Sequence, residues 1–300
     1  MKLFPKILTI LMTLAVSAAA QTQTYDPNTN TTPNPVMPKT RSDQVSWGRN
    51  DNLGDMQRYQ RVLIFKKMTE TVYRKPDRDE VKDLVADETL RAPYADFLKL
   101  PKTGMIRLLK DMGCEDGKTG VAATDQCLKY PFPGNGSAYS FRQKSHWIRS
   151  LADIALADDV FSIAGSLAVG MFVDVGDVAL DRVSNTTPGA DFIFDFKPSR
   201  DVDEANAQND ELKKGIVKGN FRYLKQIRAA ENRTFLMRYV AYRGVVRKTF
   251  NGFLYNELDF DKRRDLVVAF RVVKKEADGS VWLLWRELRS DDAPRLKQTD

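Results

Sequence analysis

The chain has one histidine, His146, and only two cysteines among its 300 residues. Zinc sites are built mainly from histidine and cysteine ligands, so a lone histidine beside two cysteines that can pair with each other excludes a tetrahedral zinc site. A Ser-His-Asp triad would have to use His146, which lies beside Lys144 on the polar face of an alternating segment, and neither a G-x-S-x-G nor an S-x-x-K motif occurs. We therefore predict no metal and no cofactor, and we interpret His146 as a solvated side chain.

Beyond the N-terminus the chain has no apolar run of the roughly 20 residues that a transmembrane helix needs. The N-terminus carries Lys2 and Lys6, then an apolar stretch over residues 7–16, then three alanines at 18–20. This order is typical of a cleaved secretory signal peptide of bacterial type at residues 1–20. A retained membrane anchor is the alternative, but the apolar stretch is too short for one. The sequence thus predicts an exported protein, periplasmic or extracellular, with no transmembrane segment in the mature chain.

Residues 21–53 are rich in Thr, Asn, Gln and Pro and hold too little apolar surface to offset the entropy of ordering, which predicts a disordered linker. Further along, Cys114 and Cys127 are the only thiols. In an exported chain with two cysteines, a disulfide is expected. A redox pair is the alternative, but the spacing is not C-x-x-C. We therefore expect a structural Cys114–Cys127 disulfide.

Residues 54–130 are predicted to be a helical segment with a disulfide loop. Apolar residues three and four apart predict a helix from Asp55 to Lys75, which Pro76 ends. Shorter helices are expected after Asp77 or Asp79 and around 94–100. A last helix is expected from Thr103 to Gly113, with Met105, Ile106, Leu108, Leu109 and Met112 as its apolar residues.

From Tyr139 onward the apolar period changes to two, which indicates β-strands. The clearest signal lies at 264–288, where two alternating runs flank Asp278-Gly279, a pair that favours a β-hairpin turn. Further strands are expected at 139–147, on both sides of Asp158-Asp159, at 167–175, at Phe192, Phe194 and Phe196, at 234–243 and at 253–258. A polar helix at 201–218 interrupts them, and 291–300 resembles a loose tail. The fold class is α+β: an N-terminal helical segment followed, over 131–300, by an antiparallel β-rich body, either a sandwich or an open barrel.

Carboxylates are the remaining catalytic candidates. One pair flanks a glycine on an apolar strand, and a second group alternates in NELDFD and would share one face if that stretch were extended. Such a cluster would supply an acid–base pair or a calcium site. We prefer to interpret it as a solvated strand end neutralised by the basic run 262–264. The candidates are Asp174, Asp177, Glu257, Asp259 and Asp261.

Basic residues interleave with aromatic ones between 221 and 250. They would form a face that meets phosphate or carboxylate groups. The alternative is that they cover a sheet edge and deter edge-to-edge pairing. Without residues 1–20 the formal net charge falls from +7 to +5, which permits an anionic partner. The binding candidates are Arg238, Arg243, Arg247 and Lys248.

These observations predict an exported, non-catalytic binding or scaffold protein associated with the bacterial envelope. Its expected partner is an envelope polysaccharide, an anionic lipid or another exported protein, while export makes nucleic acid an improbable target. One alternative is a carboxylate-dependent hydrolase that acts on an envelope polymer or polysaccharide. Another is a purely mechanical or assembly role, in which the interaction surface is a dimer interface.

Overall fold

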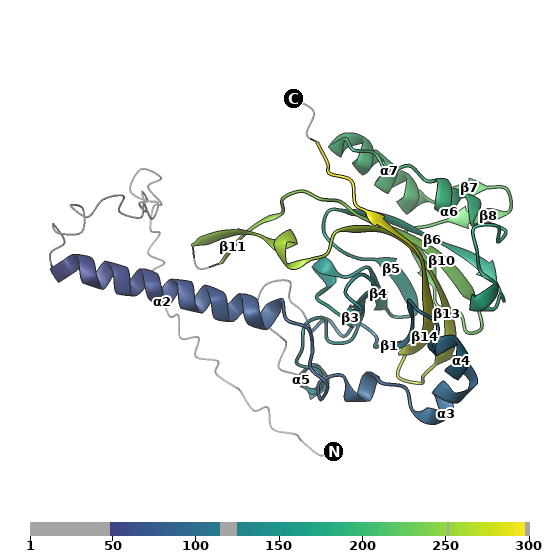
Figure 1. Ribbon diagram of the computed structural model, residues 1–300, viewed down its shortest axis with the longest axis horizontal. Helices are drawn as coiled ribbons and strands as arrows, with labels where there is room; N and C mark the ends of the chain where they lie inside the picture. The colour runs from purple at the N-terminus through teal and green to yellow at the C-terminus, as the bar shows by residue number, and fades with distance from the viewer. Residues whose placement is uncertain (1–48, 115–124, 251, 298–300) are drawn as a thin grey trace, which may run out of the picture. The chain divides into compact units, whose positions relative to one another are not determined.

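The computed structural model describes residues 49–114, 125–250 and 252–297, and the chain divides into two units, Met1–Met56 and Gln57–Asp300 (Figure 1). The predicted signal peptide and residues 21–48 of the predicted linker lie outside the described residues. Helix α2 (Arg49–Val72) includes residues 49–53, which corrects their assignment to the disordered linker, and it ends, as expected, ahead of Pro76. Within the described part of the chain, no helix combines the length and the apolar content that crossing a bilayer requires.

A five-stranded antiparallel sheet, the central sheet, organises the unit Gln57–Asp300. Its two longest strands form the predicted hairpin, which turns at Asp278-Gly279, and Gly279 has the positive φ of +84° that such turns favour. Alternate residues of this hairpin face opposite sides of the sheet, and both sides are buried. In spatial order the strands are β1 (Thr103–Leu108), β14 (Val281–Asp292), β13 (Arg264–Lys275), β10 (Thr234–Ala241) and β6 (Ala168–Gly176).

Strand β1 corrects the helix expected from Thr103 to Gly113. The apolar residues of this stretch fit a helical face and a strand equally well, so their spacing does not decide between the two. Pairing decides: Met105 and Ile106 lie opposite Leu284 and Leu283 of β14. At Gly104 a side chain would collide with the indole of Trp285, since a Cβ atom there would lie 2.6 Å from the ring nitrogen. Tertiary contacts therefore override the local helical preference.

A second antiparallel sheet packs face to face on the central sheet. The ring of Phe161 on the second sheet lies 5.4 Å from that of Phe270 on the central sheet. Phe141, in a turn of the second sheet, lies 5.3 Å from Trp285. The strand expected at 139–147 is two short strands joined by a turn, whereas the hairpin expected at Asp158-Asp159 is confirmed. The strands are, in spatial order, β3 (Ser145–His146), β2 (Ala138–Ser140), β4 (Ile154–Ala157), β5 (Val160–Ile163) and β9 (Gln226–Arg228).

Helices cover the other face of the central sheet, beside β6 and β10 (Figure 1). The polar helix predicted at 201–218 is confirmed as α7 up to Lys214, and its expected last residues form strand β7 instead. The Asp201 carboxylate caps the first turn of α7. The strand expected at Phe192, Phe194 and Phe196 is wrong: it is the short helix α6, which brings Phe192 and Phe196 together at 6.0 Å. Three aromatics spaced by two fit either structure, because the first and third lie four apart. This layer contains α6 (Asp191–Asp195), α7 (Val202–Lys214), β7 (Ile216–Lys218), β8 (Phe221–Tyr223) and α4 (Ala95–Leu98).

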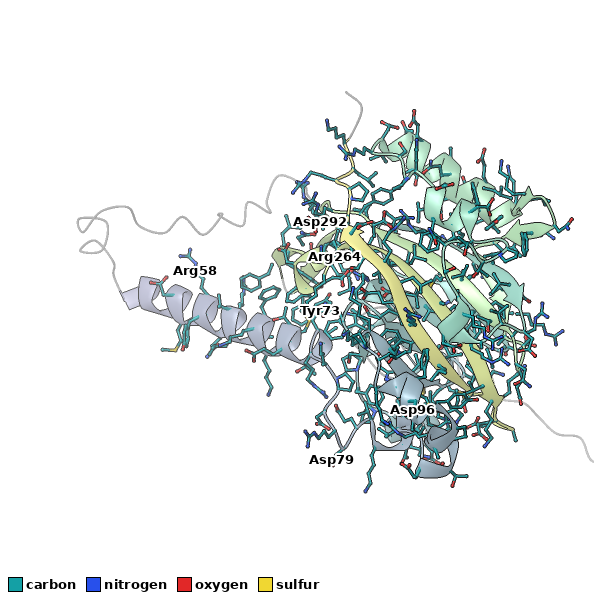
Figure 2. All side chains as sticks on the ribbon, turned by 45° about the vertical axis from the view of Figure 1, so that its right-hand side comes forward. Arg58, Tyr73, Asp79, Asp96, Arg264 and Asp292 are labelled. Carbon is teal, nitrogen blue, oxygen red and sulfur yellow. A yellow bond between two sulfur atoms is a disulfide. The ribbon has the colours of Figure 1, made fainter. Side chains whose placement is uncertain are left out.

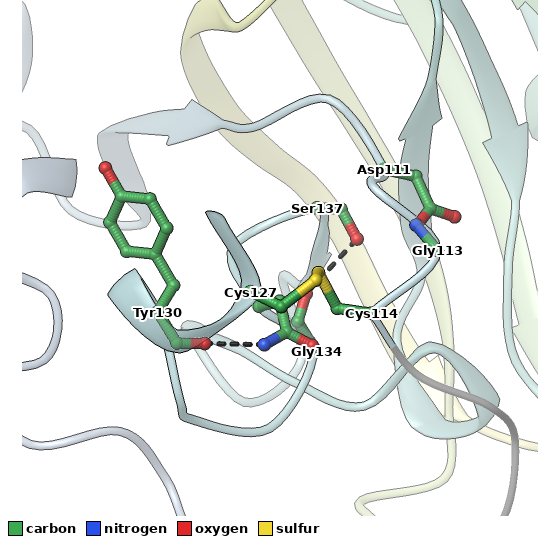
Figure 3. The surroundings of a disulfide bond; sticks show 8 residues. Asp111, Gly113, Cys114, Cys127, Tyr130, Gly134 and Ser137 are labelled. Atoms are coloured by element: carbon green, nitrogen blue, oxygen red, sulfur yellow. Dashed lines mark hydrogen bonds between the residues drawn. A yellow bond between two sulfur atoms is a disulfide. The ribbon is translucent and has the colours of Figure 1, made fainter. Parts of the chain in front are cut away.

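The predicted disulfide is present. Cys114 and Cys127 are bonded and buried, beside the turn in which Ser137 Oγ donates to the carbonyl of Gly134 at 3.1 Å (Figure 3). The expected α+β class with an antiparallel β-rich body is confirmed, and the described strands form open sheets rather than a closed barrel. The remaining elements are η1 (Lys82–Leu84), α3 (Glu88–Arg91), η2 (Ala92–Tyr94), α5 (Asp125–Lys129), η3 (Arg149–Leu151), η4 (Leu180–Arg182), β11 (Arg247–Phe250), β12 (Phe253–Asn256) and η5 (Glu257–Phe260).

The expected loose tail is ordered over its described part. Strand β14 continues to Asp292, and two isolated parallel bridges then fix the chain, one between Arg243 and Arg295 and one between Asp201 and Lys297. The stretch after β14 therefore forms a wall between the end of β10 and the start of α7.

Candidate functional site

Two of the candidate acids are buried, which corrects their interpretation as a solvated strand end. Asp261 accepts hydrogen bonds from Arg142 at 2.5 Å and from Arg263 at 2.7 Å. Arg142 also donates to Asp153 at 2.7 Å, and the side chains of Arg142, Asp153 and Asp261 have no exposed surface. Burial raises the pKa of the Asp153 carboxyl. Because solvent does not reach this network, it holds the second sheet to the segment after η5 and offers no surface to a substrate.

Glu257 is the second buried acid and is completely enclosed. Its Oε1 atom accepts hydrogen bonds from Lys248 at 2.5 Å, Ser150 at 2.8 Å and Tyr73 at 3.3 Å. Lys248, one of the expected binding residues, is therefore engaged with this acid. Burial raises the pKa of the Tyr73 hydroxyl, so that hydroxyl donates to Glu257 as a neutral group.

The three acids of the NELDFD stretch do not share a face, because Glu257 and Asp259 lie on the 3-10 helix η5 and not on a strand. Asp259 is exposed and accepts a hydrogen bond from Asn256 at 2.7 Å. The condition for an acid cluster, an extended backbone, is therefore not met.

Asp174 lines a cleft. Its carboxylate pairs with Arg233 at 3.0 Å, and both line a cleft of about 460 Å³ together with Asn220 and Arg222. Among the described residues that line this cleft there is no second carboxylate. Asp177 is paired instead with Arg271 at 2.7 Å. Most glycosidases act through two carboxyl groups, and the described lining of this cleft provides only one.

His146 is buried, which corrects its interpretation as a solvated side chain. Its Nε2 atom lies 2.8 Å from the carbonyl oxygen of Arg107, and because a carbonyl oxygen only accepts, Nε2 carries the proton. The ring packs edge-on against Tyr139, with centroids 5.3 Å apart. Burial lowers the pKa of His146 to about 4. The imidazole therefore links the second sheet to β1 as a neutral group that solvent does not reach.

Arg238, the first expected binding residue, is also buried and only 3% exposed. Its Nε and Nη2 atoms donate to both oxygens of Asp265, at 2.5 and 2.6 Å, and Nη1 donates to the carbonyl of Ile193 at 3.0 Å. Such a two-pronged pair fixes β10 against β13 and α6. The Arg238 guanidinium is therefore engaged with partners inside the protein and is not exposed to a ligand in solvent. Arg247, by contrast, is exposed on β11.

Arg243 lies at a cleft of about 380 Å³, the basic cleft, where four separate segments meet. Arg243 follows β10, and its backbone N–H donates to the carbonyl of Pro294 at 2.9 Å. Lys297 donates from its backbone to the carbonyl of Arg200 at 2.7 Å, which fixes the segment that contains Arg200. The backbone thus holds the walls in place. The lining residues are Phe196, Lys197, Pro198, Arg200, Arg243, Asp265, Asp292, Ala293 and Pro294.

The charges of the basic cleft are unbalanced. Its two acids are engaged: Asp265 pairs with Arg238, and Asp292 pairs with Arg264, which lies beside it in Figure 2. Its three basic side chains, those of Lys197, Arg200 and Arg243, are exposed, and within residues 49–297 as described none of them has a hydrogen-bond or ion-pair partner. Guanidinium groups present parallel N–H donors that match carboxylate and phosphate oxygens. The cleft is therefore suited to an anionic group.

Sequence reasoning found Arg243 but missed Lys197 and Arg200. Both flank Pro198 in the short string FKPSR, directly after α6. Two basic residues on either side of a proline are a weak signal by themselves. Lys197 and Arg200 become part of a cleft because the chain at the end of β14 and just after it lies beside them.

No group of three or more His, Cys, Asp or Glu side chains in the described part of the chain is arranged to hold a metal ion. Comparison with known proteins adds no relationship: no family model matches the chain, and neither a curated protein nor a solved structure shows detectable similarity to it.

Proposed function

We propose that the protein is an exported, non-catalytic binding module that holds an acidic envelope polysaccharide in the basic cleft. The observation that carries the proposal is the set of three unpartnered basic side chains, Lys197, Arg200 and Arg243, around one concave site. Binding sites for small ligands have volumes of roughly 300–1,000 Å³. A cleft of about 380 Å³ therefore suits one charged sugar unit of a longer chain.

Export is supported by two independent features. The N-terminal sequence has the order of a signal peptide. The disulfide between Cys114 and Cys127 is of the kind that persists in oxidising compartments. An envelope polymer with carboxylate or phosphate groups is a partner that such a protein would meet.

A binding role fits the acidic side chains better than the alternative of a carboxylate-dependent hydrolase. Glu257 and Asp261 are enclosed by their ion pairs. Asp174 reaches a cleft, but the described lining of that cleft offers it no partner acid. Binding through the basic cleft requires no such pair.

Titration calorimetry with polygalacturonate oligomers tests the proposal, with neutral dextran oligomers as the comparison. We expect binding of the acidic oligomer alone, weakening as salt rises. Arg200→Gln and Arg243→Gln should each lower the affinity about tenfold or more, since each removes a charge-assisted hydrogen bond. Lys213→Gln is the matched control, because Lys213 is exposed on α7 and pairs with Asp210 outside the cleft.

Two results would overturn the proposal. One is equal binding of acidic and neutral oligomers, or binding of neither. The other is an affinity that stays unchanged when Lys197, Arg200 and Arg243 are all replaced by glutamine. Recovery of the uncleaved chain from the cytosol would contradict the export part separately.

A further inference from the structure

Helix α2 exposes an unusual number of large apolar side chains. Tyr59, Val62, Leu63 and Ile64 are 64%, 49%, 45% and 49% exposed. The nearby hairpin β11–β12 adds Leu254 at 66%, and Val245 precedes it at 58%. Soluble proteins rarely expose clusters of large apolar side chains to water, so such a cluster indicates a surface that binds another molecule or a membrane.

One side of α2 is already packed. Phe65 contacts the rings of Phe253 and Tyr255 of the hairpin at 5.4 and 5.5 Å, and β11 lies near α2 in Figure 1. At the end of the helix Tyr73 stacks on Phe260 at 4.2 Å. These contacts hold helix and hairpin together as one structure, the helix–hairpin arm, made of residues 57–67 and of β11–β12 with Val245.

The other side of the helix, the bare face, is exposed in the described part of the chain. Tyr59 and Leu63 are four residues apart and so lie on one face, roughly opposite Phe65. Lys66 and Lys67 flank this face one turn further along. The bare face therefore combines apolar side chains with positive charge.

The charges of the arm are all of one sign. Residues 57–67 contain four basic residues and no acidic one, and the hairpin adds Arg247 and Lys248 without an acid. Lys66 is paired with Glu70 and Lys248 with Glu257. Within the described residues, Arg61, Lys67 and Arg247 have no ion-pair partner. A second copy of the same positive surface would be repelled, whereas an anionic surface would be attracted.

We propose that the helix–hairpin arm docks on an anionic phospholipid surface. Tyr59 and Leu63 enter the boundary between headgroups and acyl chains, as the apolar face of an interfacial helix does. The lysine and arginine side chains contact the lipid phosphates, while their methylene stems cover apolar surface. The arm shares no residue with the basic cleft, so this inference goes beyond the proposed function and does not depend on it.

Co-sedimentation with lipid vesicles tests the inference, using the chain that begins at Gln21. We expect binding to vesicles of phosphatidylglycerol and phosphatidylcholine in equal parts, and little binding to pure phosphatidylcholine. Replacing Arg61, Lys66 and Lys67 by glutamine should lower the partition coefficient about fivefold for each charge removed. Leu63→Asp should abolish binding, because it places a carboxylate among the headgroups.

Val217→Asp is the matched control. Val217 is a 65% exposed apolar residue on β7, outside the arm, so its replacement should leave vesicle binding unchanged. Since Leu63 is also exposed, both variants should unfold at the urea concentration of the parent chain, which separates lost binding from lost folding.

Three results would overturn the inference. The first is equal binding to both kinds of vesicle, and the second is no binding to either. The third is a dimer, detected by light scattering, that Leu63→Asp dissociates, because a second copy would then cover the bare face. Failure of lipid binding leaves polysaccharide binding at the basic cleft untouched, and the reverse also holds.

Discussion

Arg142 donates a hydrogen bond from Nε to the carboxylate of Asp153 across 2.7 Å, and neither side chain has any exposed surface. The same guanidinium donates to Asp261 and to the backbone carbonyls of Leu151 and Lys262, so one cation pairs with two buried anions and two backbone groups. Charges in a protein interior are tolerated only when they are paired in this way. Arg142 therefore joins the turn between β2 and β3 to two other segments of the chain.

Replacing Arg142 by methionine should lower the free energy of unfolding by about 3–5 kcal/mol, because Asp153 would remain buried without its cationic partner and Asp261 would be left with Arg263. Urea denaturation measures the change. Arg228→Met is the matched control, since Arg228 pairs with Asp159 at 2.6 Å while remaining 81% exposed, and such pairs contribute less than about 1 kcal/mol. Equal effects of the two substitutions would show that burial of the network has no energetic consequence.

Acidification should destabilise the protein through His146. Its pKa is about 4 in the folded state and about 6.5 in an unfolded chain, so between these values the unfolded state binds the proton more readily. The contribution is present above about pH 6.5, falls as the pH drops and is lost below about pH 4. Between pH 7 and pH 5 the free energy of unfolding should fall by about 2 kcal/mol through this group.

His146→Gln keeps a donor for the carbonyl of Arg107 but removes the titration. The pH dependence of the unfolding free energy between pH 7 and pH 5 should therefore be about 2 kcal/mol smaller than in the parent chain. Urea midpoints at several pH values provide the comparison. An identical pH profile for the two proteins would mean that His146 is not held neutral by burial.

Gly165→Ala should cost about 1–3 kcal/mol more than Gly219→Ala. Both glycines have positive φ, +86° and +57°, so both substitutions carry backbone strain. Only at Gly165 would the new Cβ collide, at 2.1 Å from the Tyr239 hydroxyl, which donates to the carbonyl of Ala152 at 3.0 Å. Thermal unfolding of the two variants isolates the steric part, and similar melting temperatures would contradict it.

Local patterns were sufficient for elements whose signals lie within a few neighbouring residues. The alternation around Asp278-Gly279 predicted the long hairpin, and the polar stretch after Asp201 predicted α7. Because the chain has only two cysteines, the disulfide between them could be predicted as well. Each of these depends on turn chemistry, capping or residue count. None requires knowledge of the rest of the fold.

Other features depend on distant segments and were missed. The stretch from Thr103 is a strand because Leu283 and Leu284 lie opposite it. Glu257 appeared to be a solvated acid because nothing near it in sequence shows that Tyr73 and Ser150 enclose it.

The candidate site was predicted least completely. Of the four expected basic residues Arg243 alone lines the basic cleft, whose other charges, Lys197 and Arg200, come from a separate loop. Arg238 could not be placed from its neighbours, because its burial depends on Asp265 on the next strand. Charge and aromatic content were visible in the sequence, but exposure was not.

The order of the central sheet has a consequence for synthesis. Strand β1 borders β14, although the two strands lie far apart in the sequence. Thr103–Leu108 therefore cannot pair with its neighbour until Val281–Asp292 has also been synthesised. The central sheet therefore closes through contacts between strands far apart in the sequence, which slows its folding relative to a sheet of neighbouring strands.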